Sequence, residues 1–253
     1  MKAIVLAGGG LPFDLRGVAP EVSSKAFLPL QGKPIVEYVS QTLYHCALSE
    51  IVLVGDEKAV TPAMHSQIDR VVPSGSTIID SLTNGMEPMK GEKQVLVCAG
   101  DLPLLNVEVV QNFIRSSQES LGELTYAIVR REDSEAVFPG FTHTYVKLKD
   151  GSFCGGGLFM LPPRALENFR RFMEQITEMR KTPWKLAGLM GFDIIVKWIF
   201  KTLNISDLEI KAGQLLGVSA KAIISSPETA YNIDNLIQYK SAVNFFAGKE
   251  KFG

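Results

Sequence analysis

Short apolar runs and helix-period stretches alternate along this chain. Runs of mostly apolar residues lie at 2–7, 51–54, 94–99 and 124–129. Each run is too short for an ordinary helix and therefore indicates a strand buried in a parallel sheet. After Pro34 and over 107–117, apolar residues instead recur about every 3.6 positions, which is typical of a helix that covers a sheet. The alternation predicts an α/β fold with right-handed crossovers.

The second half of the chain continues with a different order of elements. We predict an antiparallel extended pair within 138–148, a strand over 153–161, a helix over 164–180, a strand over 218–225 and a helix over 236–246. The pattern is that of one domain, 1–253, in which 163–217 forms a helical insertion.

A stretch that begins at Thr182 is dense in large apolar side chains, Trp198 and Phe200 among them. This density is too great for one exposed helix. Packing into the main core is the favoured interpretation, and a contact in a homodimer comes second. A membrane-facing role is the weakest, because Lys197 and Lys201 are also compatible with solvent.

Three glycines, Gly8 to Gly10, follow the first strand. They let the backbone approach a ligand, and the N–H groups exposed in such a turn favour anions such as phosphates. The sequence GGGLPF matches neither GxxxxGK[ST] nor GxGxxG, so a purely structural turn is the alternative. Lys25 then precedes an apolar run, a turn and a helix, which completes a unit of strand, glycine loop, lysine and helix.

Asp101 follows the apolar run at 94–99, and Pro103 prevents the strand from continuing. Ligands of open α/β sheets bind outside the carboxyl ends of the strands, where Gly8 to Gly10 are also expected. An isolated aspartate at this place would more often cap the helix that begins near Val107.

Three motifs carry a resemblance to a known family: LAGGG at 6–10, SKAFLPLQGKPI at 24–35 and CAGDLPLL at 98–105. They resemble the MobA-like nucleotidyltransferases, which include molybdenum-cofactor guanylyl- and cytidylyltransferases, methylerythritol-phosphate cytidylyltransferase and sugar-1-phosphate nucleotidylyltransferases. The resemblance covers 1–162 and 218–247. It implies a three-layer α/β/α, Rossmann-like fold of the nucleotide-diphospho-sugar transferase (GT-A) type, with a mostly parallel sheet.

The family's first loop wraps a nucleoside triphosphate, and its lysine neutralises phosphate charge. The resemblance therefore implies nucleotide binding by Leu6, Ala7, Gly8, Gly9, Gly10 and Lys25. The family usually places an arginine about three residues after the last loop glycine, where this chain has Phe13. Arg16 is the candidate substitute, and with Lys25 and Asp101 it completes the predicted catalytic set.

The segment 74–86 is similar to the family's base-recognition segment, in which a glycine-containing loop leads into a helix. The similarity implies that Gly75, Asp80 and Ser81 contact the nucleotide. A helix N-terminus capped by Ser76, Thr77 or Asp80 explains the same sequence about as well.

The segment 230–235, AYNIDN, resembles the family's late motif, whose acidic or amide residue completes a metal site. The resemblance implies Mg²⁺ held by Asp101 and Asp234, and hard oxygen donors suit an ion that also bridges substrate phosphates. The usual Thr-Pro-Glu-Asp sequence is missing after Asp234. Helix capping by Asp234 or Asn235 is therefore the alternative.

A glycine run, Gly155 to Gly157, lies in the strand predicted over 153–161. The resembling strand of the family carries a glycine pair against the acceptor substrate, which implies that Gly156 and Gly157 bind the acceptor. The extended pair predicted within 138–148 is expected near the same acceptor. Close packing of the backbone against a neighbouring element explains these glycines equally well.

Composition narrows the classes of partner. Lys and Arg total 26 against 27 Asp and Glu, so the net charge of −1 gives no electrostatic footprint for nucleic acid. No apolar run approaches the ~18 residues of a spanning helix, and the first residues lead into a strand rather than a leader peptide. The expectation is a cytoplasmic protein whose partners are a nucleoside triphosphate and a small-molecule acceptor.

Cysteine and histidine usage supports no other chemistry. Cys46, Cys98 and Cys154 share no metal-type spacing and are expected to be buried free thiols. The three histidines are scattered, with no serine or cysteine motif that would pair with them in a hydrolytic triad.

The reaction implied is nucleotidyl transfer from a nucleoside triphosphate, CTP or GTP, to a phosphorylated or hydroxylated acceptor, with release of pyrophosphate. A nucleotide sensor without turnover is one alternative. A GT-A glycosyltransferase is another, although it should carry Asp-x-Asp where this chain has Asp101-Leu102-Pro103. A Rossmann dehydrogenase is disfavoured because GxGxxG is absent.

Overall fold

The computed structural model describes residues 1–179, 188 and 191–250. The strands are β1 (Lys2–Leu6), β2 (Pro29–Leu30), β3 (Lys33–Pro34), β4 (Glu50–Val54), β5 (Arg70–Val72), β6 (Val95–Ala99), β7 (Leu124–Arg130), β8 (Val146–Leu148), β9 (Gly151–Leu161) and β10 (Ala220–Ile224). The helices are α1 (Ile35–Tyr44), α2 (Pro62–His65), α3 (Ile78–Met86), α4 (Val107–Glu119), α5 (Arg131–Val137), α6 (Leu166–Met179), α8 (Phe192–Ile199), α9 (Ile205–Leu216) and α10 (Leu236–Glu250).

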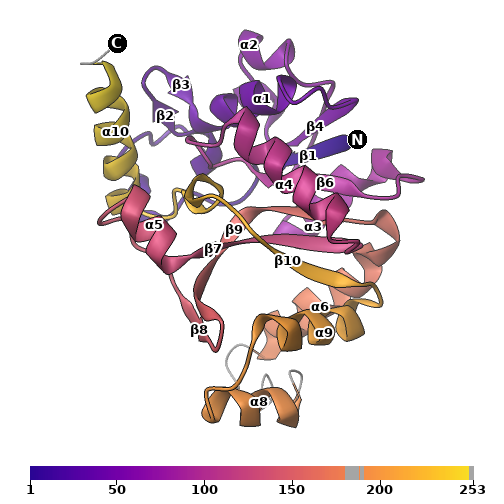
Figure 1. The fold of residues 1–253 in the computed structure, drawn as a ribbon. Coiled ribbons are helices and arrows are strands. Elements are labelled where there is room, and N and C mark those ends of the chain that lie inside the picture. The colour runs from indigo at the N-terminus through magenta and orange to yellow at the C-terminus, as the bar shows by residue number, and fades with distance from the viewer. Residues whose placement is uncertain (180–187, 189–190, 251–253) are drawn as a thin grey trace.

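One mixed sheet runs through the centre of the molecule in the order β10-β7-β9-β6-β1-β4-β5, with β8 paired to β9 (Figure 1). β1 pairs in parallel with β4 and β6, β4 with β5, and β7 with β10. β9 is inserted between β6 and β7 and runs antiparallel to both. The prediction of a mostly parallel sheet is confirmed.

Helices cover both faces of the sheet, because the side chains of each buried strand alternate between the two faces. In β1, Ala3 and Val5 pack into the core under α1 and α4, whereas Ile4 packs into the core under α3, α6 and α9. Figure 1 shows α1 and α4 above the sheet and α6 and α9 below it. The predicted three-layer α/β/α architecture is confirmed.

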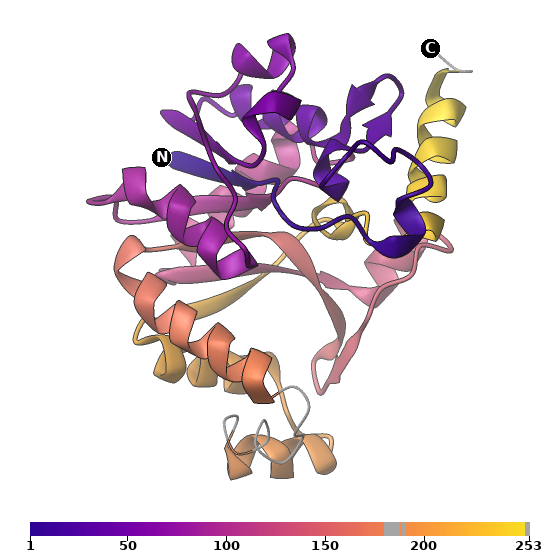
Figure 2. The same cartoon turned by 180° about the vertical axis from the view of Figure 1, so that it is seen from behind.

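A third apolar cluster lies beside the sheet and holds the long connection between β1 and α1. It joins Leu15, Leu28 and Leu30 of this connection to Tyr231 and to Ala242 of α10. Figure 2 shows α10 alongside this connection, next to the β2–β3 hairpin. Both ends of the chain therefore stabilise the same loop.

The prediction of an extended pair over 138–148 is wrong for most of its length. Only Val146–Leu148 forms a strand, and it pairs with the start of β9. α5 precedes this segment and was not predicted; two acidic residues in its first turn and the Arg131–Glu135 pair favour a helix there. Gly140, with φ of +83°, then turns the chain.

The region 163–217 contributes to the main core. α6 and α9 pack on the sheet through Phe169, Phe172 and Leu216. The predicted second helix starts at Thr182, outside the described residues. Farther along, Ile194 of α8 is buried, but Trp198 and Phe200 are exposed, so core packing does not account for these two side chains.

Among the described residues, no helix combines the length and the hydropathy that a membrane-spanning segment needs. The three cysteines are buried free thiols, as predicted.

Gly85 determines how closely α3 approaches the sheet. A Cβ atom there would lie 2.7 Å from Val54 Cγ2 and 2.8 Å from Ile4 Cγ2. We expect Gly85→Ala to lower the free energy of unfolding by about 1–3 kcal/mol through overpacking, measured by urea denaturation.

Gly248→Ala is the matched control. Gly248 is also helical, but a Cβ atom there would meet no atom within 4 Å. The substitution should be neutral or slightly stabilising, since alanine is the better helix former. Equal effects of the two substitutions would contradict the close contact between α3 and the sheet.

Candidate nucleotide site

Three charged residues that are far apart in the sequence meet at the carboxyl ends of the central strands. Lys25 Nζ lies 2.6 Å from Asp101 Oδ2 and also contacts the carboxylate of Asp234. Asp101 is buried, whereas Asp234 is about half exposed. One ammonium group thus joins two carboxylates that differ in solvent access.

Lys25 is positioned by its neighbour Ser24. The Ser24 hydroxyl donates a hydrogen bond to the backbone carbonyl of Ala7, at 2.7 Å, and accepts one from Ala26 N–H. The first bond fixes the lysine turn to the residue that follows β1. The second caps the short 3₁₀ turn on which Lys25 lies.

Asp101 is positioned by the end of β6. Gly100 N–H donates to the carbonyl of Leu6, at 2.9 Å, so β6 stays in register with β1 up to the turn. A Cβ at Gly100 would lie 2.9 Å from that carbonyl oxygen, and only glycine allows this approach. The carbonyl of Asp101 accepts a hydrogen bond from Ile233 N–H, at 3.3 Å, which brings the late segment to the same place.

Asp234 is held within that late segment. Its N–H donates to Gln238 Oε1, at 2.8 Å, and Asn232 Nδ2 donates to its carboxylate. Of the two residues considered as helix caps, Asn235 takes that role: its Oδ1 accepts a hydrogen bond from Gln238 N–H, at 2.9 Å. Asp234 is therefore left to face Lys25.

Burial and mutual attraction oppose each other in this cluster. Burial raises the pKa of Asp101 above its ordinary value, although the nearby Lys25 charge acts in the other direction. For Lys25, burial lowers the pKa, but its close contacts with the Asp101 and Asp234 carboxylates outweigh that effect, and the net shift is upward. Lys25 is therefore a firmly protonated cation.

A cavity of about 500 Å³ opens beside this cluster. Nine residues predicted from the sequence line it: Leu6, Gly8, Gly9, Lys25, Gly75, Ser81, Asp101, Gly156 and Gly157. It lies between the loop after β1, the start of α3 and the inserted strand β9. This is the place that a parallel α/β sheet provides for a ligand.

Five predicted residues do not line this cavity; Asp234 lines the adjoining cavity, and the other four are Ala7, Gly10, Arg16 and Asp80. Ala7 is buried and Gly10 lies out in the loop. Arg16 is exposed, with its guanidinium carbon 5.8 Å from the centroid of the Phe13 ring. Asp80 faces its own loop, as described below. Their predicted roles in nucleotide binding or catalysis stay predictions.

A second cavity, of about 530 Å³, adjoins the first and shares three lining residues with it: Tyr126, Gly155 and Asn232. Asp234 lines this second cavity together with polar residues on 142–144 and with Gln238. Burial lowers the pKa of His143 on this wall, so its imidazole is neutral at pH 7.

Sequence reasoning placed the segment 138–148, which holds Thr142 and His143, near the acceptor but singled out neither residue, and it assigned Tyr126 and Gln238 to no site. They sit on a strand face, an irregular loop and a helix, and no motif connects them. Asn232 was noticed only as a position in the late motif, two residues before Asp234. Cys154 also lines the second cavity, and burial raises its pKa to about 11, so it is a thiol at neutral pH.

The loop before α3 is tied together by its own side chains. Gly75 N–H donates to Ser81 Oγ at 3.0 Å, and the Asp80 carboxylate accepts from the hydroxyls of Ser76 and Thr77, both at 2.8 Å. Thr77 Oγ1 also accepts from Asp80 N–H and is the N-cap of the helix. These bonds lower the pKa of Asp80.

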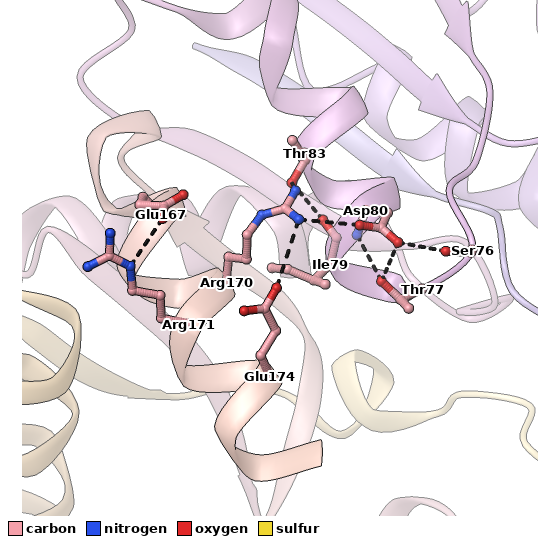
Figure 3. A network of polar contacts seen from close by, with 9 residues as sticks. All are labelled: Ser76, Thr77, Ile79, Asp80, Thr83, Glu167, Arg170, Arg171 and Glu174. Atoms are coloured by element: carbon pink, nitrogen blue, oxygen red, sulfur yellow. Dashed lines mark hydrogen bonds and ion pairs between the residues drawn. The ribbon is translucent and has the colours of Figure 1, made fainter. Parts of the chain in front are cut away.

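Arg170 of α6 connects this loop to the region 163–217 (Figure 3). Its guanidinium donates to Thr83 Oγ1 at 2.8 Å and pairs with Asp80 at 3.4 Å. The next residue, Arg171, pairs instead with Glu167 on its own helix. No sequence pattern indicated the contact between Asp80 and Arg170, which are 90 residues apart.

The glycines of β9 line the first cavity and also allow neighbouring side chains to pack closely against the strand. A Cβ at Gly156 would lie 2.9 Å from Ala127 Cβ, and one at Gly157 would lie 2.8 Å from Leu102 Cδ1. The packing explanation offered for this pair is therefore sound. Its assignment to acceptor binding stays a prediction.

The donor atoms near Lys25 fit a magnesium ion. Asp101 Oδ2 is buried and, among the described residues, accepts no hydrogen bond of ordinary geometry, although Lys25 Nζ lies close to it. Asp234 supplies a second carboxylate. Mg²⁺ is commonly held by one or two carboxylates, with substrate phosphates and water completing the shell.

The mixed sheet, its two helical layers and the cavity at the carboxyl ends of β1 and β6 define a Rossmann-like α/β protein, with a fold that nucleotidyltransferases share. The chain belongs to the MobA-like NTP transferase domain family, which matches it over residues 3–176. The resemblance inferred from the three motifs is confirmed. Asp234 lies beyond the matched residues, so its place in the site rests on geometry alone.

The curated relatives that the chain matches are named as cytidylyltransferases. A 2-C-methyl-D-erythritol 4-phosphate cytidylyltransferase of Clostridium botulinum is 32% identical over 128 residues, which cover 47% of this chain and 54% of that protein. The enzyme of the same name from Clostridium acetobutylicum is 27% identical over 127 residues, 46% of this chain and 53% of that one. The chain thus spans about half the length of the curated relatives it matches.

Solved structures match nearly the whole chain. A hypothetical transferase from Thermus thermophilus is 32% identical, with a TM-score of 0.81 over 96% of this chain and 99% of that one. The 4-diphosphocytidyl-2C-methyl-D-erythritol synthase of Anaerococcus prevotii has a TM-score of 0.61 at 13% identity and covers 97% of both chains. The second likeness shows the shared fold alone.

The ion pair of Lys25 can be tested by removing its charge. Lys25→Met leaves the buried Asp101 carboxylate without its cation, and we expect the free energy of unfolding to fall by about 1–3 kcal/mol, less than for a fully buried pair. Adding Asp101→Asn should recover most of the loss. The measurement is urea denaturation followed by circular dichroism.

Lys33→Met is the control, because Lys33 is exposed and lies 3.8 Å from Glu37; its effect should stay within about 0.5 kcal/mol. A double variant no more stable than Lys25→Met would show that the unpaired Asp101 charge is not the cause of the loss.

The contact between α6 and α3 yields a second test. Arg170→Met should speed backbone hydrogen exchange across 75–81 and lower the melting temperature by a few degrees, because the Asp80 carboxylate and the Thr83 hydroxyl lose a shared donor. Arg171→Met is the matched control, and it should leave exchange in that loop unchanged. Equal exchange in the two variants would show that Arg170 does not order the loop.

Proposed function

We propose that this chain is a nucleotidyltransferase that transfers a nucleoside monophosphate from a nucleoside triphosphate to a small acceptor. An acceptor oxygen attacks the α-phosphorus, the new P–O bond forms, and the bond to the pyrophosphate leaving group breaks. The observation that carries this proposal is the cluster of Lys25, Asp101 and Asp234 beside a cavity lined by Gly8 and Gly9. In this proposal, residues 1–253 form a single nucleotidyltransferase domain, with 163–217 as its helical insertion.

The first cavity is the proposed nucleotide site. Gly8 and Gly9 offer an anion-binding turn without side chains, and Gly75 and Ser81, which line the same cavity, are assigned to the base. Lys25 is the one basic residue among the described residues that line the cavity, so phosphate charge is assigned to it. Phosphates would then compete with Asp101 and Asp234 for the Lys25 ammonium.

Asp101 and Asp234 are the proposed ligands of Mg²⁺. When bound there, the ion would neutralise phosphate charge and polarise the phosphoryl oxygens. The chain itself contributes orientation and charge: the glycine turn fixes the triphosphate, and Lys25 stabilises charge on the phosphates.

CTP is the proposed donor, with GTP second. The choice rests on the names of the curated relatives, which are cytidylyltransferases. The second cavity is the proposed acceptor site, because it shares Tyr126, Gly155 and Asn232 with the nucleotide cavity and is lined by polar side chains. Its hydroxyl, amide and imidazole groups suit a phosphorylated or hydroxylated molecule.

A nucleotide sensor without turnover is the second candidate. It is favoured by the position of Arg16, which is exposed and stacks on Phe13 outside the cavity, so that Lys25 faces the phosphates without an arginine. A sensor and an enzyme would both bind the nucleotide, so only a measurement of turnover distinguishes the two.

Calorimetric titration of CTP, GTP, ATP and UTP, with and without Mg²⁺, tests the proposal. We expect Mg²⁺-dependent binding of CTP. Asp101→Asn should remove the Mg²⁺ dependence and lower pyrophosphate release at least about a hundredfold, because a bound metal is worth several kcal/mol of transition-state stabilisation. Its melting temperature should stay nearly unchanged.

Asp133→Asn, at an exposed position on α5, is the control and should keep wild-type binding. Failure of all four nucleotides to bind would contradict the proposed function. Tight binding with no pyrophosphate released in the presence of any phosphorylated acceptor would favour the sensor. A large loss of stability in Asp101→Asn would make Asp101 a structural residue.

A further inference from the structure

A third cavity, of about 270 Å³, lies under α9 on the face of the sheet that carries α3 and α6. Its walls come from β7, β8, β9, β10 and α9. The residues that line it include Leu124, Ile128, Val146, Leu148, Phe153, Ile205, Leu208 and Ala212. The cavity is not fully enclosed by these elements, so a ligand can enter it.

The chemistry of this cavity is apolar. Its two charged members neutralise each other, because Lys221 Nζ lies 2.9 Å from Glu209 Oε2. The other carboxylate oxygen of Glu209 accepts a hydrogen bond from Ala222 N–H, also at 2.9 Å. A ligand here therefore meets hydrocarbon surface and no unpaired charge, which selects against polar molecules.

The cavity borders the two cavities described above. Tyr126 and Gly155 line all three, and Cys154 lines this one and the proposed acceptor cavity. The Tyr126 hydroxyl packs against Gly155, where a Cβ would lie 2.1 Å from it. Tyrosine suits such a border, since its ring is apolar and its hydroxyl is polar.

We infer that the acceptor is amphipathic: its phosphate or hydroxyl end lies in the polar cavity, and an alkyl or similar apolar group lies in the cavity under α9. This inference rests on the proposed function. It narrows the acceptor class from small polar molecules to those that carry a hydrocarbon portion.

A second copy of the chain is the competing occupant, since Val146 at the rim is half exposed. Two observations favour a ligand. The cavity is small and walled by five elements, whereas a stable protein interface buries about 800 Å² on each partner. It also borders the acceptor cavity at Tyr126 and Gly155, where a substrate has to lie.

Butyl, hexyl and octyl phosphate are the probes, titrated calorimetrically into the protein in the presence and absence of Mg²⁺ and CTP. We expect affinity to rise roughly fourfold for each added methylene that is buried. The concentrations stay below those at which octyl phosphate forms micelles. An affinity that does not change with chain length would overturn the inference.

Ala212→Phe fills the cavity from α9 and should remove the dependence on chain length while leaving CTP binding unchanged. Ile210→Phe is the control, because Ile210 is on the same helix but 59% exposed; it should keep the dependence. Ala222→Leu fills the cavity from β10 and replaces Ala212→Phe if that variant does not fold. Retention of the dependence in a folded, filled variant would also overturn the inference.

Sedimentation velocity on wild type and Ala212→Phe distinguishes a bound ligand from a second copy of the chain as the occupant of the cavity. A wild-type dimer that dissociates in the variant assigns the cavity to a second copy and overturns the inference. The proposed function fails in a different experiment: if no nucleotide binds, the nucleotide site is wrong, whatever the alkyl phosphates do. CTP binding without chain-length dependence overturns only the amphipathic acceptor.

Discussion

A buried carboxylate at the end of a central strand is the constraint on which the rest of this structure depends. Asp101 follows β6 in the middle of the sheet, where an isolated charge is costly. Lys25 balances it, but Lys25 is on a long connection with little regular structure. The fold therefore has to hold that connection in place. It does so with the hydrogen bond from the Ser24 hydroxyl to the carbonyl of Ala7, just after β1, and with an apolar cluster beside the sheet.

The C-terminal part of the chain completes this arrangement. Leu236 N–H, at the start of α10, donates to the carboxylate of Asp14, and Ile233 N–H donates to the carbonyl of Asp101. Tyr231 is buried in the same apolar cluster as the connection after β1. Asp234 reaches Lys25 because its neighbours on both sides are anchored. The site is thus built by loops, but each loop is tied to the core.

Much of this was predictable from the sequence, because strand ends and glycine loops follow from local patterns. The parallel strands, the Gly8 loop, Lys25 and Asp101 were all found in this way. Contacts between distant segments carry no such signal. The pairing of Asp80 with Arg170, the insertion of β9 between β6 and β7, and the polar wall around His143 depend on tertiary packing. Gly85 illustrates the difference: it lies in the segment 74–86, whose sequence gave no sign that this glycine packs α3 against the sheet.

Lys25 and Asp234 are 209 residues apart, which affects when their contact can form during synthesis and folding. Contacts between such distant positions close large loops, which costs conformational entropy. During synthesis, β1 and the glycine turn emerge long before the segment that carries Asp234, so the nascent chain has the turn but only half of the acidic pair. The complete charge cluster therefore exists only after both ends of the chain have docked.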